Sequence, residues 1–128
     1  MTILEKIKEF SKTFMYEEFN TNSNSFLQIK KYFIASIKDI NKKKYSEKEF
    51  EIILFISHTI GNKPFITQEE IYNLIYKKLG EKISIDKLLE LNNEIRQSEL
   101  CQNLIINYSV GSKYWKNTII PINESGSI

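Results

Sequence analysis

Features that would mark a secreted, membrane or disulfide-rich protein are missing from this sequence. A single cysteine, Cys101, excludes an internal disulfide framework and fits a reducing cytoplasm. No apolar run approaches the roughly 20 residues that a membrane-spanning helix needs. Charged residues already occur within residues 1–6, which is not the pattern of a signal peptide. We therefore expect a cytoplasmic protein without a membrane segment.

Signatures of catalysis are missing as well. The sequence has no Gly-rich phosphate loop, nucleophile elbow or metal-ligand spacing, and its acidic residues are scattered rather than paired. The only histidine, His58, has no cysteine or histidine at ligand spacing and is interpreted as structural. Cys101 is interpreted as a small half-buried residue, because no neighbouring cation in the sequence would activate its thiol. We expect a protein that is not an enzyme and that uses no metal or cofactor.

Charge is spread unevenly along the chain, although the net charge is only +2. Residues 1–44 contain 9 Lys and Arg against 5 Asp and Glu, whereas residues 45–128 contain 9 against 11. The length suits one domain with a single core, so residues 1–128 are treated as a single domain. The slightly acidic later part argues against a broad basic patch of the kind that marks nucleic-acid binding.

Two apolar patterns occupy the N-terminal region, residues 1–44. Residues 2–19 predict an amphipathic helix with a stripe formed by Ile3, Ile7, Phe10, Phe14 and Phe19. After a polar loop, residues 25–41 predict a second helix through Phe26, Ile29, Phe33, Ile37 and Ile40. A strand stays open there, because the segment is rich in β-branched and aromatic residues. An aromatic stripe of this kind usually marks an interface, so we expect a homodimer formed through this region.

Residues 45–120 show the order of a winged helix-turn-helix, which is three helices followed by a β-hairpin. Ser46 and Thr67 each stand three residues before a glutamate, the spacing of a capping box. Gly61 and Gly80 are predicted to end the first two helices in a left-handed conformation. A third helix begins at Ser84 and carries the apolar stripe Leu88, Leu91 and Ile95.

The hairpin is predicted from two apolar runs around a turn. Residues 104–108 and 118–120 flank the turn-like residues 110–113. Residues 121–128 lack helical periodicity and are predicted to be a loose tail. The expected fold class is therefore mainly α with a small β-hairpin wing, a winged helix-turn-helix preceded by N-terminal helices.

Residues 45–57, Tyr-Ser-Glu-Lys-Glu-Phe-Glu-Ile-Ile-Leu-Phe-Ile-Ser, resemble the segment that opens the winged helix in the Sar branch of the MarR-like regulators. Residues 29–33 and the two N-terminal helices are also similar. The resemblance implies a small dimeric transcription regulator. Its third helix, here the one with Lys87, would enter the major groove of double-stranded DNA, and its wing would lie along the backbone. The family's Asp-Glu-Arg wing and its long C-terminal helix have no counterpart here.

A second resemblance leads to the same module. Residues 48–51, Gly61, residues 67–71 and residues 111–114 are similar to the output domain of OmpR/PhoB-type response regulators, with Lys113 in place of the second wing glycine. Both families imply a winged helix. They differ in the N-terminal region, where the OmpR type implies a small sheet and the Sar type implies helices.

Candidate DNA-binding residues follow from this layout. With the apolar stripe of the third helix toward the core, its outward face would carry Lys87, Glu90, Asn93, Glu94 and Gln97, with Arg96 at the flank. Amide side chains can bond adenine edges, and basic ones can reach guanine or phosphate. The predicted contact residues are Lys87, Asn93, Arg96, Gln97, Lys113, Tyr114 and Lys116. A solvated face that reads nothing, and a winged-helix module that binds a protein instead of DNA, stay open as alternatives.

Overall fold

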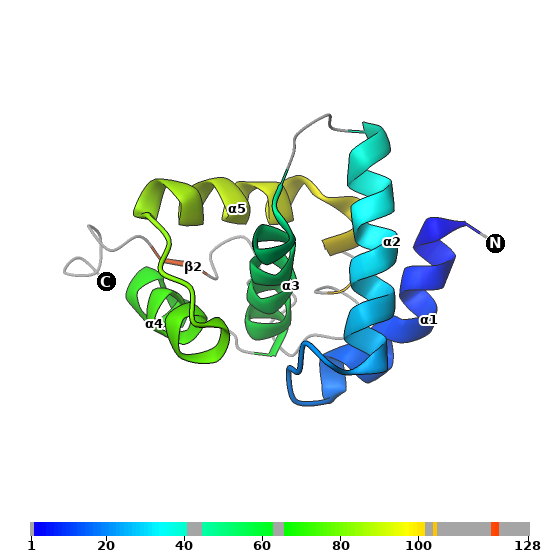
Figure 1. Ribbon diagram of the computed structural model, residues 1–128, viewed down its shortest axis with the longest axis horizontal. Helices are drawn as coiled ribbons and strands as arrows, with labels where there is room; N and C mark the ends of the chain where they lie inside the picture. Colours follow the sequence, from blue (N-terminus) through cyan, green and yellow to red (C-terminus); the bar gives the residue numbers. More distant parts are fainter. Residues whose placement is uncertain (1, 41–44, 63–65, 102–103, 105–118, 121–128) are drawn as a thin grey trace.

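The computed structural model describes residues 2–40, 45–62, 66–101, 104, 119 and 120, and this part of the chain is mainly helical (Figure 1). This confirms the mainly α expectation. The helices are α1 (Ile3–Tyr16), α2 (Asn24–Ile40), α3 (Glu47–Asn62), α4 (Gln68–Leu79) and α5 (Ile85–Gln97). The strands β1 (Ile66–Thr67) and β2 (Ile119–Ile120) have two residues each.

Helix α3 lies at the centre of the fold. Figure 1 shows α1 and α2 on one side of it, α4 on the other, and α5 running across one end. Buried side chains occur on nearly every side of α3, as expected for a helix that is covered by neighbours all round. Helix α3 therefore supplies the surface against which α1, α2 and α5 all pack.

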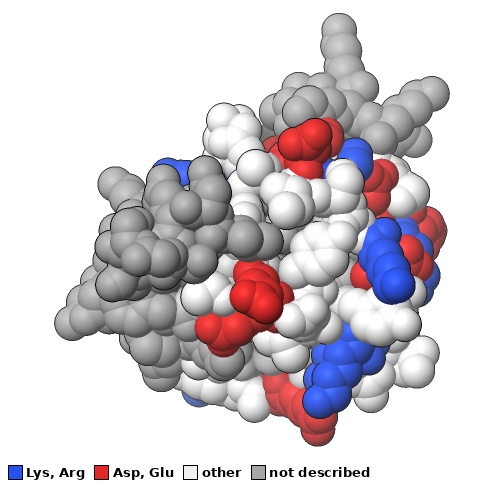
Figure 2. All heavy atoms as spheres, turned by 90° about the vertical axis from the view of Figure 1, so that its left-hand side faces the viewer, with Lys and Arg blue, Asp and Glu red and all other residues white. Residues whose placement is uncertain are grey.

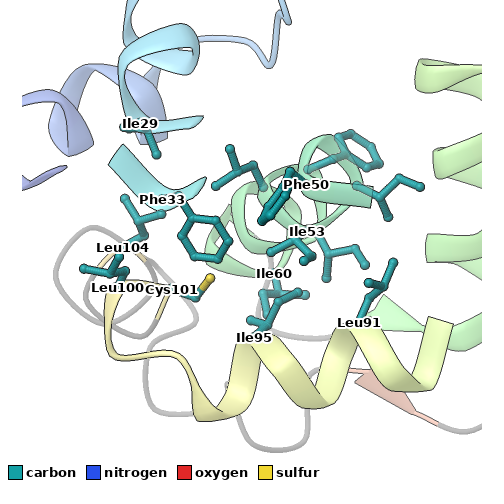
Figure 3. Close-up of a cluster of buried hydrophobic side chains, with 14 of the residues drawn as sticks. Ile29, Phe33, Phe50, Ile53, Ile60, Leu91, Ile95, Leu100, Cys101 and Leu104 are labelled. Carbon is teal, nitrogen blue, oxygen red and sulfur yellow. The ribbon is translucent and has the colours of Figure 1, made fainter. Parts of the chain in front are cut away.

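The core collects side chains from segments far apart in the sequence. Figure 3 shows Phe33 from α2, Phe50 and Ile53 from α3, and Leu91 and Ile95 from α5 gathered in one cluster. All five are buried. The position of α5 is thus set by apolar packing against α3, which is the main source of helix stability in a folded protein.

The predicted aromatic stripe of α1 packs within the chain itself. Ile7 and Phe14 are buried, and Phe19 in the following loop makes edge-to-face contacts with Phe26 and Phe55 at ring-centroid distances of 5.3 and 5.0 Å. Because α2 and α3 cover this stripe, it does not supply the exposed apolar patch from which a dimer was expected. The helical alternative for residues 25–41 is correct through Ile40, and the strand alternative is wrong.

The capping residues recognised in the sequence lie where the structure begins α3, α4 and α5. The Ser46 N–H donates to Glu49 Oε1 at 2.8 Å while Ser46 Oγ accepts from the Glu49 N–H at 3.1 Å, which is the predicted reciprocal box. Thr67 and Ser84 cap α4 and α5 through their hydroxyl groups. Gly80 ends α4 at φ 69°, a left-handed conformation that favours glycine.

The stop predicted at Gly61 is wrong. Gly61 is buried inside α3, which continues to Asn62. At the end of α3, Asn62 Nδ2 donates to the Met15 carbonyl oxygen of α1 at 3.1 Å, a tertiary contact, and to the His58 carbonyl oxygen of its own helix at 2.8 Å. Gly61 keeps a helical conformation, since the helix continues to Asn62.

The predicted hairpin is not what the described residues show. Leu104, expected at the start of its first strand, is helical and buried, as are Leu100 and Cys101. The Ser98 hydroxyl accepts from the Cys101 N–H at 3.2 Å, a helix-capping contact that outweighs the β-branched composition of this region. Strand β2 does form, but it pairs in parallel with β1, with Ile66 opposite Ile119. Residues 105–108, the turn at 110–113 and the tail at 121–128 lie outside the described residues.

We expect the Cys101 thiol to resist modification in the folded protein. It is fully buried rather than half-buried, and burial raises its pKa to about 11 even though Ser57 and Ser98 hydrogen-bond to it. About one thiol in a thousand would then be ionised at pH 8, and only the thiolate reacts readily. Ellman's reagent should titrate the thiol in guanidinium chloride but only very slowly in buffer. A stoichiometric reaction within the mixing time in buffer would contradict this buried position.

Candidate nucleic-acid interface

Helix α5, the predicted reading helix, turns its apolar stripe to the core as expected. Leu88, Leu91 and Ile95 are fully buried, and the Ser84 hydroxyl accepts from the Lys87 N–H at the start of the helix. Three of the predicted contact residues lie exposed on the solvent side of the helix: Asn93, Arg96 and Gln97. The structure therefore brings these three together on one surface.

Lys87 is partly exposed, and its ammonium group is ion-paired within the protein. Its ammonium group lies 2.9 Å from Glu49 Oε2 and 3.1 Å from Glu90 Oε2, and its side chain is only 35% exposed. The hydrogen bond to Glu49, and then that to Glu90, raises the pKa of Lys87. Burial alone would raise the pKa of Glu49, but the Ser46 N–H and the Lys87 ammonium together lower it. Lys87 therefore ties the first turn of α5 to the first turn of α3.

Glu94 was also expected to face outward, and this prediction is wrong. The residue is 7% exposed, and its Oε1 accepts a hydrogen bond of 2.8 Å from the Tyr45 hydroxyl group. Burial, and then the bond to Glu94, raises the pKa of the Tyr45 phenol above its ordinary value. The buried side of α5 is thus wider than its apolar stripe, because Tyr45, two residues before α3, packs against it. Glu90 remains on the exposed edge.

Two apolar residues of the exposed face were missed by the sequence interpretation. Ile85 and Leu89 are each 44% exposed, although Leu89 directly follows the buried Leu88 in sequence. A helix advances 100° per residue, so Leu89 points away from the stripe that Leu88 joins. Together with Asn93 and Gln97 they form a row at four-residue spacing along the solvent side of α5. The spacing was visible in the sequence, but the row was obscured by the neighbouring apolar stripe.

The charge on this side of the molecule is mixed. Figure 2 shows the face that carries α4, β2 and the beginning of α5, with basic groups interspersed among acidic ones over its described part. No continuous basic band crosses the described residues of this face. The remaining predicted contacts, Lys113, Tyr114 and Lys116, lie outside the described residues.

The pairing of β1 with β2 brings two distant points of the chain together. Residues 119 and 120 follow α5 in sequence, yet they lie beside residues 66 and 67, at the start of α4. Residues 119 and 120 therefore lie beside the helix that precedes α5 in sequence. This pairing places residues 119 and 120, at the end of the predicted wing segment, next to the start of α4.

The only histidine of the chain, His58, has a structural role. A ring nitrogen of His58 donates to the Glu17 carbonyl oxygen at 2.9 Å, its ring packs edge-on against Phe14, and burial lowers its pKa. These contacts tie the loop after α1 to α3, in agreement with a structural role. Among the described residues, no cluster of His, Cys, Asp or Glu could hold a metal ion. None of the described helices is long and apolar enough to cross a membrane.

No protein-family model matches the chain, and no curated protein or solved structure matches it.

Proposed function

We propose that this protein is a DNA-binding transcription regulator of the winged helix-turn-helix class, with α3, α4 and α5 as its helical part and α5 in the major groove. The observation that carries the proposal is the pairing of β1 with β2. A strand between the first and second helices of the module pairs with a strand that follows the third, so three helices and a returning C-terminal segment close into one unit.

Two further features support this proposal. Residues 80–84 make a short turn between α4 and α5, and the left-handed Gly80 allows the chain to change direction there. Helices α1 and α2 precede the module, which fits the Sar-like arrangement better than the small sheet of the OmpR type. A homodimer stays part of the proposal, because two related reading helices match the half-sites of palindromic DNA.

The proposed source of phosphate attraction is the segment after α5 and not α5 itself. Lys87 is held by two carboxylates, and Asp86 and Glu90 lie on the exposed side of α5. Neutralising phosphates requires basic groups elsewhere, and Lys113 and Lys116 in the predicted wing can supply them. The lysine run at residues 42–44 is a further source.

We expect the wild-type protein to bind duplex DNA at low salt, and the double variant Lys113→Ala, Lys116→Ala to bind every duplex more weakly. Each lost phosphate contact lowers the slope of log affinity against log salt by roughly 0.9, so the slope should fall by about two contacts. Fluorescence anisotropy over a salt series measures this. The double variant Lys8→Ala, Lys12→Ala, on the exposed side of α1, removes the same charge and should leave the slope unchanged. A wild-type protein without affinity for any duplex at low salt would end the proposal.

A second function is favoured by one observation. The exposed face of α5 places Asp86 and Glu90 around the apolar pair Ile85 and Leu89, a combination that suits a basic, partly apolar protein segment. Under this alternative the module binds a protein and not DNA. Absence of duplex binding at low salt, with circular dichroism showing a folded protein, would favour this alternative.

A further inference from the structure

Helix α5 contains two basic residues, Lys87 in its first turn and Arg96 in its last turn. The Lys87 ammonium group lies within 3.1 Å of two carboxylates, one from Glu49 of α3 and one from Glu90 of α5 itself. One positive charge thus faces two negative charges. Lys87 therefore brings no net positive charge to the beginning of the proposed reading helix.

Glu49 is fixed in place by a second set of contacts. Its Oε1 accepts a hydrogen bond of 2.8 Å from the Ser46 N–H, and its own N–H donates to the Ser46 hydroxyl group. The Glu49 side chain is only 22% exposed. If the Lys87 ammonium group moved to a DNA phosphate, a partly buried carboxylate would lose its partner. Unpairing such a charge is unfavourable, which favours retention of the pair with Glu49.

Glu90 lies on the more exposed side of the same ammonium group. Its side chain is 41% exposed, and it follows Lys87 by three residues on α5. Residues at this spacing are neighbours on a helix surface. A phosphate that approached Lys87 would come close to the Glu90 carboxylate, and like charges repel each other. Both carboxylates therefore oppose a contact between Lys87 and the DNA backbone.

We infer that Glu49 and Glu90 keep Lys87 away from the DNA backbone, so that the protein binds duplex DNA more weakly than its own basic residues would allow. This inference rests on the proposed function and adds what limits its affinity for DNA. Glu49 and Glu90 are positioning residues in this arrangement, because they act through Lys87. Phosphate contacts carry no sequence information, so the limit applies to every duplex alike.

The double variant Glu49→Gln, Glu90→Gln should free Lys87 for a phosphate contact. Glutamine at position 49 keeps the acceptor for the Ser46 N–H, so the capping box and α3 should still form. One added contact makes the slope of log affinity against log salt steeper by roughly 0.9, and it tightens binding on the order of tenfold at 50 mM salt. Fluorescence anisotropy over a salt series measures both quantities, and circular dichroism checks the fold.

Two controls separate the release of Lys87 from a general loss of repulsion. In a Lys87→Met background the two glutamine substitutions should leave the slope unchanged, because the lysine that gains the contact is missing. The double variant Glu5→Gln, Glu9→Gln, on the exposed side of α1, removes the same charge and should also leave the slope unchanged.

Glu90→Gln alone gives a second measurement that leaves the capping box intact. Because Glu49 still competes for Lys87, the slope should become steeper by less than in the double variant. If the double variant does not fold, this single variant decides the question, and an unchanged slope overturns the inference.

The outcomes separate this inference from the proposed function. Duplex binding by the wild type, with the same slope in both glutamate variants, would overturn the inference while the DNA-binding proposal stands. An equal change of slope with and without Lys87 would also overturn it, because the carboxylates would then act by repulsion alone. Lack of wild-type binding to any duplex at low salt would overturn both.

Discussion

Leu91→Ala should destabilise the folded protein by about 2–5 kcal/mol, whereas Leu89→Ala should change the free energy of unfolding by less than about 0.5 kcal/mol. The two residues lie two positions apart on α5 and carry the same side chain. Leu91 is fully buried between α5 and α3, so its truncation leaves a cavity in the core. Leu89 is 44% exposed and has much less packing to lose.

Urea denaturation followed by circular dichroism measures both free energies. Leu89→Ala serves as the matched control, because the two variants have the same composition and the same helix propensity. A large loss of stability in both variants would mean that α5 is covered on both sides. A larger loss of stability for Leu89→Ala than for Leu91→Ala would show that the helix is rotated from the orientation described here. The residues assigned to the exposed row of α5 would then be wrong.

The parts of the fold that could be predicted are those set by local signals. The hydroxyl groups of Ser46, Thr67 and Ser84 each accept a hydrogen bond from the backbone N–H three residues later. A short stretch of sequence is therefore enough to predict these caps. The buried stripe of α5 follows from spacing alone, and so does the left-handed Gly80 that ends α4. Such signals require no knowledge of what the helix packs against.

The parts that could not be predicted depend on distant partners. Gly61 remains helical because α3 is anchored at Asn62 by the carbonyl group of Met15, which lies 47 residues earlier in the sequence. Residue 104 belongs to an apolar run that suits a strand, yet it is helical and lies in the core. Strand β2 was found, but its parallel partner β1 has only two residues and no pattern of its own.

The candidate site shows the same division. Asn93, Arg96 and Gln97 are exposed as expected, because the apolar stripe fixes the opposite side of the helix. Lys87 and Glu94 stand at the edges of that stripe, where a polar residue is either solvated or paired. Their partners are Glu49, in the first turn of α3, and Tyr45, just ahead of that helix, and no spacing within α5 indicates them. The sequence therefore predicts the centre of an exposed face better than its borders.

The pair at one of these borders leads to the other large effect, the loss expected on Tyr45→Phe. This change removes only the hydroxyl group that donates to the buried Glu94 at 2.8 Å. A hydrogen bond to a charged group is worth about 1.5–3 kcal/mol, and the ring contact between Tyr45 and Phe50 is retained. We expect a loss of stability in this range, measured by urea denaturation at neutral pH. Tyr76→Phe is the matched control, because Tyr76 is 52% exposed and should tolerate the change.

A double-mutant cycle with Glu94→Gln isolates the bond itself. If the two groups act as a pair, the double variant should cost clearly less than the sum of the single ones. The pKa of the phenol is raised in the folded state, so the folded protein retains this proton where the unfolded chain, with its ordinary pKa near 10, releases it. Stability contributed by the pair should therefore be present below pH 10 and decline as the pH rises above it, and Tyr45→Phe should remove that decline.

Because Glu94 follows Asn93 directly, loss of the Tyr45–Glu94 hydrogen bond should also raise the rate of amide hydrogen exchange in the second half of α5. Additive single losses with unchanged exchange would show that Tyr45 packs against α5 without helping to hold its exposed face in position.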